Sequence, residues 1–208
     1  LDGTVAIAQG KEPAGKQRLI DVLGKVGKPA EMVRSPDGSE IMILPYGGRL
    51  LGLFSAQSAE NFYWPNTALE SVESARAFYA GPQWQNSGGD RTWLPPEADV
   101  FFPEFPSLTK YVQPRQLDPG HFEVIKADGT VRLVNRLSVT LSRTHEKVDL
   151  EMAKSFGPAP NPLRYERDLK GVDDLEYAGY TQWTTLAIRG TNPAQVGPVG
   201  LWNLVQMP

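Results

Sequence analysis

The clearest pattern in the sequence is an alternation of apolar and polar side chains that starts after residue 129. Val131, Leu133, Leu137, Val139 and Leu141 occupy odd positions, and polar residues such as Arg132 and Ser138 stand between them. Residues 127–129 (ADG) precede this run and are typical of a hairpin turn. The pattern therefore predicts a strand with one buried face, beginning near residue 131.

Shorter apolar runs predict further strands on both sides of this one. Val148, Leu150 and Met152 alternate with acidic residues, while Leu186 and Ile188 indicate a strand nearer the end. Turn-forming sequences at 35–38 (SPDG) and 45–48 (PYGG) divide the earlier part of the chain. Besides the run from residue 131, the expected strands cover residues 31–34, 41–44, 50–54, 148–152, 186–188 and 199–205.

Two segments carry a helical pattern instead. In residues 14–26, Leu19, Ile20 and Leu23 form an apolar stripe at helical spacing, and glycines at 24 and 27 favour a stop. A second helix is expected to begin at residue 67, because Thr67 and Glu70 match a capping box, and to end at residues 81–82 (GP). Helix thus accounts for a small share of the chain.

Composition favours one β-rich domain over residues 1–208. Eighteen prolines and twenty glycines, dispersed along the chain, indicate many turns, and no shift in composition marks a domain boundary. We therefore expect an all-β fold with one or two short helices.

Charge and residue usage exclude several function classes. A net charge of −3 without basic clusters gives no general attraction for nucleic acid, and the sequence lacks the apolar run of about 18 residues that a membrane span needs. The absence of cysteine excludes disulfides, thiolate metal sites and cysteine nucleophiles. The chain begins at Leu1, so we expect a processed or trimmed N-terminus. The compartment stays open between the cytoplasm and export after removal of a signal peptide.

The segment 84–97 (WQNSGGDRTWLPPE) holds the densest group of candidate functional residues. Gly88 and Gly89 allow backbone angles that other residues avoid, so we expect a stiff, glycine-hinged turn there. Indoles, amides, a guanidinium and carboxylates together suit a sugar, whose C–H faces stack on rings and whose hydroxyls bind polar groups. The structural alternative is a rigid loop whose tryptophans fill the core and whose Asp90 and Arg91 pair with each other.

Carboxylates are the candidate catalytic groups. Asp90 and Glu97 could act as general acid and base across one cavity, and Asp99 is a third candidate. Glu97 could equally orient Arg91 or cap a turn. The two histidines, His121 and His145, lack the spacing of a zinc site, and no phosphate-binding or dinucleotide fingerprint occurs. We expect neither metal nor cofactor.

Three motifs, in order, resemble galactose-mutarotase-like (aldose 1-epimerase-like) proteins from about residue 40 to the end of the chain. Residues 46–53 (YGGRLLGL) resemble the opening hairpin of that superfamily. Residues 88–97 (GGDRTWLPPE) resemble a GGHRLWxAPE segment of its poorly characterised members, and residues 199–206 (VGLWNLVQ) resemble its W-x-x-x-Q strand. The individual motifs are moderately specific, and their shared order adds weight.

This resemblance implies an antiparallel β-supersandwich with a sugar-binding cleft. In true mutarotases a glutamate is the base on the anomeric hydroxyl and a histidine protonates the ring oxygen. Here Asp90 stands where related sequences have histidine, and neither His121 nor His145 falls on a motif position. The superfamily fold is also longer than this chain, and the resemblance implies that the chain is its N-terminal part. We therefore expect an incomplete supersandwich, completed by a second chain or a missing C-terminal segment that covers open sheet edges.

The resulting hypothesis is a carbohydrate-active protein that binds a sugar and interconverts its anomers by acid/base ring opening. The alternative is a non-catalytic carbohydrate-binding or structural domain. Arginines would donate hydrogen bonds to sugar oxygens, Trp84 or Trp93 would stack on the ring, and Asp90 or Glu97 would transfer a proton. The expected substrate-binding residues are Arg49, Asn66, Trp84, Asn86, Arg91, Trp93 and Gln206.

Overall fold

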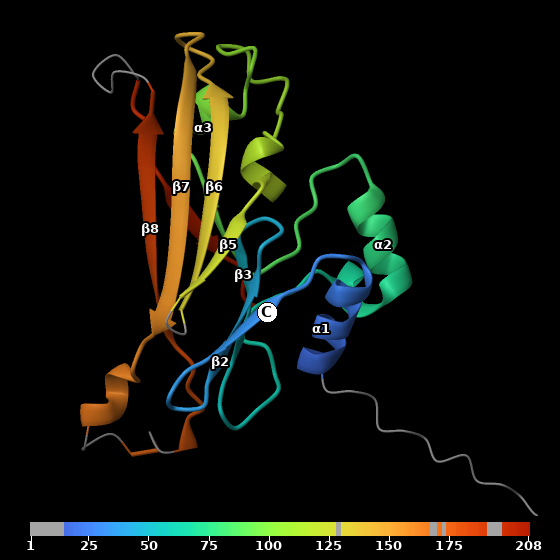
Figure 1. Ribbon diagram of the computed structural model, residues 1–208, viewed down its shortest axis with the longest axis vertical. Coiled ribbons are helices and arrows are strands. Elements are labelled where there is room, and N and C mark those ends of the chain that lie inside the picture. Colours follow the sequence, from blue (N-terminus) through green and yellow to red (C-terminus); the bar gives the residue numbers. More distant parts are fainter. Residues whose placement is uncertain (1–14, 128–129, 167–169, 172–173, 191–196) are drawn as a thin grey trace, which may run out of the picture.

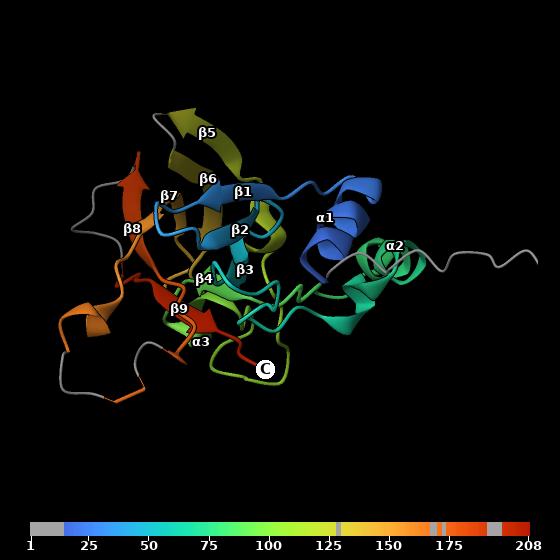
Figure 2. The ribbon, with the colours of Figure 1, turned by 90° about the horizontal axis from the view of Figure 1, so that it is seen from below.

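The protein is built mainly from two antiparallel β-sheets packed against each other (Figures 1 and 2). A computed structural model describes residues 15–127, 130–166, 170–171, 174–190 and 197–208. The first sheet has the strand order β1-β2-β3-β4-β9, and the second has the order β5-β6-β7-β8. The strands are β1 Glu31–Arg34, β2 Glu40–Leu44, β3 Arg49–Phe54, β4 Asp90–Trp93, β5 Glu123–Ala127, β6 Thr130–Thr140, β7 Lys147–Pro158, β8 Tyr180–Arg189 and β9 Trp202–Val205. The expectation of an all-β class is confirmed.

Helices α1 and α2 cover the first sheet on the side away from the second. Helices α1 and α2 lie side by side (Figure 1) and share an apolar cluster with β2 and β3 that includes Leu23, Met42, Phe54 and Ala75. Among the described residues no helix is long and apolar enough to cross a membrane. The helical elements are α1 Gly15–Lys25, α2 Val72–Ala80 and α3 Glu97–Val100, with the single turns η1 Thr67–Glu70, η2 Gln116–Gly120 and η3 Pro162–Tyr165.

Strands β2 and β3 of the first sheet are buried on both faces, which explains their continuous apolar runs. In β2, Met42 and Leu44 contact the helices, whereas Ile41 and Ile43 belong to the cluster that joins the two sheets. The register between β2 and β3 shifts at Met42 and Ile43, so Leu51 has no partner across the ladder. The bulge changes the parity of β3, so that Leu50 and Leu53 both belong to the cluster between the sheets, whereas Leu51 and Phe54 belong to the cluster under the helices.

The second sheet has the alternation that the sequence predicts. Val131, Leu133 and Leu137 on β6 are buried, as are Val148 and Leu150 on β7. Of the residues between them, those at 132, 136 and 149 are exposed, whereas those at 134 and 135 are buried as well. The strands expected at 31–34, 41–44, 50–54, 186–188 and 199–205 are also present, with bounds shifted by a few residues. The expected turn at 127–129 is only partly described, since residues 128 and 129 lie outside the described residues.

Two local predictions are wrong. The second helix is not started by a capping box of Thr67 and Glu70: the Asn66 side chain caps η1, and the Ser71 side chain accepts from Ser74 N at the start of α2. The segment after Gly89 is not a turn but the strand β4, which lies between β3 and β9. Its sequence, DRTW, lacks an apolar alternation, so its pairing depends on distant strands.

The glycine pair before β4 is required by backbone packing. Gly88 and Gly89 have φ angles of +100° and +66°. A Cβ atom on Gly88 would lie 2.2 Å from the carbonyl oxygen of Trp64, and one on Gly89 would lie 2.2 Å from that of Leu50. The prediction that this position needs glycine is confirmed, and the contacts are with the protein's own backbone.

Gly89→Ala should therefore lower the free energy of unfolding by more than about 2 kcal/mol, because the cost of a left-handed conformation adds to the cost of a backbone clash. Gly24→Ala is the matched control: Gly24 lies in α1 with open space around its Cα, so a gain of about 1 kcal/mol is expected there. Urea denaturation measures both. Equal effects at the two positions would contradict the packing argument.

Candidate functional site

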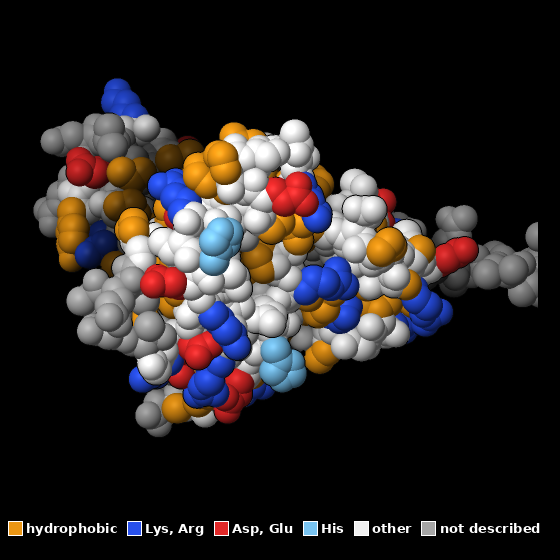
Figure 3. Space-filling view, turned by 90° about the horizontal axis from the view of Figure 1, so that it is seen from above, with side chains coloured by type: hydrophobic (Ala, Val, Ile, Leu, Met, Phe, Trp, Pro, Cys, Tyr) orange, Lys and Arg blue, Asp and Glu red, His pale blue; other side chains and the backbone are white. Residues whose placement is uncertain are grey.

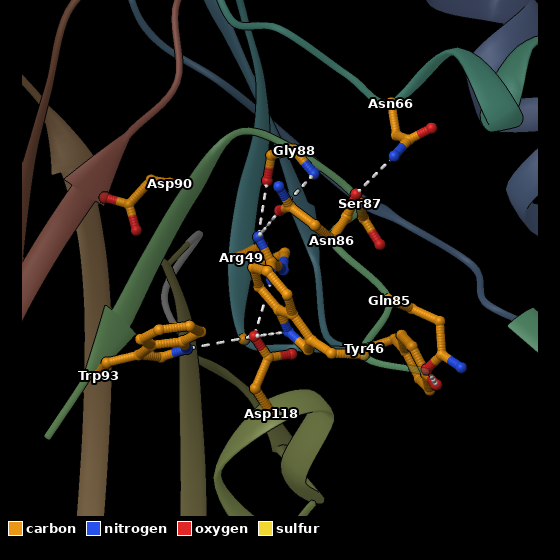
Figure 4. Close-up of polar contacts among 12 residues, drawn as sticks. Tyr46, Arg49, Asn66, Gln85, Asn86, Ser87, Gly88, Asp90, Trp93 and Asp118 are labelled. Carbon is orange, nitrogen blue, oxygen red and sulfur yellow. Dashed lines mark hydrogen bonds and ion pairs between the residues drawn. The ribbon is translucent and has the colours of Figure 1, made fainter. Parts of the chain in front are cut away.

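The candidate site is built around Asp118, a buried carboxylate in η2 that accepts three hydrogen bonds on one oxygen (Figure 4). Asp118 Oδ2 lies 2.7 Å from Arg49 Nη2, 2.9 Å from Trp84 Nε1 and 3.2 Å from Trp93 Nε1. Charge-assisted bonds of this kind are the strong ones in proteins. Asp118 thus joins β3, the segment before β4, and β4 itself.

The other end of the Arg49 guanidinium fixes the segment that leads into β4. Arg49 Nη1 donates to Asn86 Oδ1 at 3.1 Å and to the Gly88 carbonyl at 3.0 Å. Asn66 Nδ2 in turn donates to the Asn86 carbonyl at 3.0 Å (Figure 4). Because Arg49 is fully buried, this network replaces the water that its charge would otherwise bind.

A second buried ion pair connects the two sheets. Lys154 on β7 is fully buried and donates to Asp90 Oδ1 on β4 at 3.1 Å and to the Gly48 carbonyl at 2.8 Å. Burial lowers the pKa of the Lys154 ammonium, and the Asp90 carboxylate opposes that change. The pair therefore places one charge from each sheet in the interior between them.

Two tyrosines extend the Asp90 end of this pair. Tyr180 OH lies 3.5 Å from Asp90 Oδ2, and the hydroxyls of Tyr63 and Tyr180 are 2.6 Å apart. Burial, and next the negative charge of Asp90, raise the pKa of Tyr180. Both carboxylate oxygens of Asp90 consequently face groups of the protein.

On its outer side the site carries an arginine stacked on indoles. The Arg91 Cζ atom lies 4.4 Å from the Trp93 ring centre and 5.0 Å from that of Trp84. No described residue forms a hydrogen bond or ion pair with the half-buried Arg91 guanidinium, and its Nε is buried without an acceptor. Burial, and next the charge of Arg49, lower the pKa of Arg91.

Two exposed groups lie near enough to Arg91 to influence its charge. Glu97 and Tyr111 both raise the pKa of Arg91, opposing the effect of burial. Glu97 is exposed at the start of α3, and Tyr111 is 48% exposed with its ring stacked on Phe101. We call Trp84, Arg91, Glu97 and Tyr111 the Arg91 surface.

The expected site residues therefore separate into an interior group and an outer group. Arg49, Asp90 and Trp93 are at most 5% exposed, so a ligand could contact them only if the interior opened. Trp84 and Arg91 are half-buried and Glu97 is exposed. The structure does not bring Asp90 and Glu97 together through any hydrogen bond, and their catalytic roles stay predictions.

The remaining expected residues hold the backbone. The side chains of Asn66 and Asn86 form hydrogen bonds with nearby backbone groups. Asn66 donates to the Asn86 carbonyl and accepts from Ala68 N, and Asn86 Oδ1 accepts from Gly88 N. The main chain of Gln206 bonds Gly89 and Trp64, and its Oε1 is buried without a partner. Asn66 also lines a separate cavity of about 510 Å³ between α1 and the 59–70 segment.

The structural alternative for segment 84–97 is correct in one respect and wrong in another. Trp93 does fill the core, packed against Phe101 and Trp202. Asp90, however, pairs with Lys154 and not with Arg91. Successive side chains of a strand point to opposite faces, so neighbours on β4 cannot pair with each other readily.

Sequence reasoning missed Asp118 and Lys154. Lys154 continues the even-numbered, inward series of Val148, Leu150 and Met152, so a lysine in that series was an available signal. Asp118 offered none, because its partner Arg49 is 69 residues away in the sequence.

The described residues contain no group of histidine and acidic side chains that could hold a metal ion. His121 and His145 are both exposed and lie apart from each other on the face seen in Figure 3. Comparisons with protein-family models, with curated proteins and with solved structures gave no match.

The buried pair between the sheets should be sensitive to loss of either partner. Lys154→Met leaves the Asp90 charge buried alone and should cost about 3–5 kcal/mol of unfolding free energy. Asp90→Asn combined with Lys154→Met should recover part of that loss, as a double-mutant cycle in urea will measure. The control Lys110→Gln removes an exposed pair with Glu104 and should cost less than about 1 kcal/mol. Strictly additive losses at 90 and 154 would argue against a coupled pair.

The buried hydroxyl of Tyr79 should make the stability of the fold fall at high pH. Burial raises its pKa to about 12, and its hydroxyl lies 3.0 Å from Ser87 Oγ beside the site. Because the folded pKa lies above the usual 10.0, the neutral tyrosine stabilises the fold fully below pH 10, and this contribution is lost as the pH rises toward 12. Tyr79→Phe should therefore lose less stability than wild type over that interval. Parallel pH profiles for the two proteins would exclude this role.

Proposed function

We propose that the protein binds a saccharide at the Arg91 surface. The observation that carries the proposal is the Arg91 guanidinium, which is held on two indole rings without a hydrogen-bond partner among the described residues. Its free N–H groups suit sugar hydroxyls, and the exposed Glu97 carboxylate accepts hydrogen bonds from them. The exposed ring of Tyr111 and the half-buried Trp84 offer apolar surface to the C–H face of a sugar.

Preorganisation supports binding at this place. Trp84 and Trp93 are both fixed through Asp118, so the platform under Arg91 needs little ordering when a ligand arrives. A buried donor without an acceptor costs about 1–3 kcal/mol. Arg91 Nε carries this cost, as does the Nε of the interior Arg49, and proteins accept such costs at functional sites.

The resemblance to galactose-mutarotase-like proteins supports a finer description of the fold. The two packed sheets would be the N-terminal part of a β-supersandwich, and a further segment or a second chain would complete it. The β8 strand supports this idea because it lies at the edge of its sheet and carries neither proline nor lysine, two residues that commonly protect such edges.

Binding without turnover is the version that the geometry favours. An aldose 1-epimerase needs one group that takes the anomeric proton and another that protonates the ring oxygen. Of the two proposed carboxylates, Asp90 is 2% exposed and bound by Lys154, whereas Glu97 alone is open to a ligand. The enzymatic version would need Glu97 as base and an acid from elsewhere.

Titration with galactose tests the proposal through tryptophan fluorescence. Binding should change the tryptophan emission of wild type. Arg91→Gln should weaken the affinity for galactose by about tenfold, because a charged donor is lost. Trp84→Phe should remove most of the signal, whereas Trp183→Phe should retain it, since Trp183 is exposed on β8 of the other sheet.

Anomer exchange of freshly dissolved α-galactose, followed by NMR, separates the two versions. A rate equal to that in buffer supports binding alone. Faster exchange that Glu97→Gln abolishes would establish epimerase activity. If the protein bound no sugar from a panel of neutral and acidic sugars, the proposal as a whole would be refuted.

A further inference from the structure

The Arg91 guanidinium lacks a direct charge partner among the described residues. Asp118, the nearest buried carboxylate of the site, is already neutralised by Arg49 at 2.7 Å and accepts two indole N–H groups on the same oxygen. Arg91 forms no ion pair with any described residue, and Glu97 is not within ion-pair distance of it. A half-buried positive charge is thus left facing the surface with only distant compensation.

A planar guanidinium on flat rings has two properties that decide what it binds. Its N–H groups lie in one plane, which matches the two oxygens of a carboxylate. Stacking on Trp84 and Trp93 also restricts the orientation of that plane. Bonds to a charged acceptor are stronger than bonds to neutral hydroxyls, so an anion would gain more here than a neutral sugar would.

We propose that the saccharide bound at the Arg91 surface is acidic and carries a carboxylate, as a uronic acid does. The inference rests on the sugar-binding function proposed above and names its substrate class. The Arg91 guanidinium takes the carboxylate of the ligand, while the ring stacks on the neighbouring aromatic surface of Trp84 or Tyr111.

Glu97 sets the limit on the charge of the ligand. Its exposed carboxylate stands at the start of α3, which follows β4 directly, and its negative charge raises the pKa of Arg91, so it also repels an anion that approaches the guanidinium. Each further negative charge on the ligand adds to this repulsion. A sugar phosphate carries about −1.5 to −2 at neutral pH and would be repelled more strongly.

The test compares galacturonate, galactose and galactose 6-phosphate by calorimetric titration at low salt. Wild type should bind galacturonate about tenfold more tightly than galactose, since a charge-assisted bond replaces a neutral one. Galactose 6-phosphate should bind less tightly than galacturonate. Raising the salt concentration should weaken galacturonate binding and leave galactose binding unchanged.

Variants assign the preference to named groups. Arg91→Gln should reduce the preference for galacturonate to within about twofold, and Arg91→Lys should restore part of it, because the charge returns without the planar pair of donors. Glu97→Gln should strengthen galacturonate binding and leave galactose binding equal or weaker. The control Arg132→Gln removes an exposed charge on β6 and should change neither affinity. Unfolding curves of each variant verify that it is folded.

The outcomes separate the two proposals. Equal binding of galactose and galacturonate by wild type overturns the acidic-sugar inference and leaves sugar binding intact. Tighter binding of the 6-phosphate overturns the choice of a carboxylate. No binding of any of the three sugars overturns both proposals, and a galacturonate preference that survives in Arg91→Gln overturns the assignment to Arg91.

Discussion

The interior of this protein depends on satisfying two cations that water cannot reach. Arg49 and Lys154 are both fully buried, and a buried charge without partners would cost several kcal/mol. The chain meets this requirement with Asp118 and Asp90 and with the carbonyls of two glycines, Gly48 and Gly88. The Lys154–Asp90 pair joins the two sheets and the Arg49–Asp118 pair joins the first sheet to η2, so together they restrict how these parts can be arranged. Apolar packing alone would permit more arrangements.

The same requirement explains why tight glycine backbone and aromatic side chains meet at one place. For Gly88 to offer its carbonyl to Arg49, its own Cα must pass against the backbone of Trp64, where no side chain fits. The hydrogen bonds that bring Trp84 and Trp93 to Asp118 then turn their rings toward Arg91. The site is therefore layered, with a carboxylate inside, indoles over it and a guanidinium outermost.

The sequence predicted the parts of this structure that are decided by local pattern. The alternation around Leu137 and Leu150 predicted β6 and β7, and the paired glycines at 88–89 predicted a special backbone. It did not predict β4, because a strand made of DRTW is identified only by its neighbours β3 and β9. Likewise, Asp118 acquires its role from residues far along the chain. Lys154 and Asn135 were detectable, since each interrupts an inward apolar series: Lys154 binds Asp90, while Asn135 donates to the Gln116 carbonyl in η2.

A binding role for the outer layer follows from the difference between the two kinds of arginine. Both Nη groups of Arg49 donate hydrogen bonds inside the protein and its Nε is buried, so its removal would act through folding, and a ligand would gain nothing by competing for it. Arg91 receives its position from the same network but has no described partner of its own. Rigid support under a donor that has no partner lowers the entropic cost of binding, because the protein has already ordered the group. The buried charges thus position Arg91, and the surface that they prepare is the part of the molecule suited to a ligand.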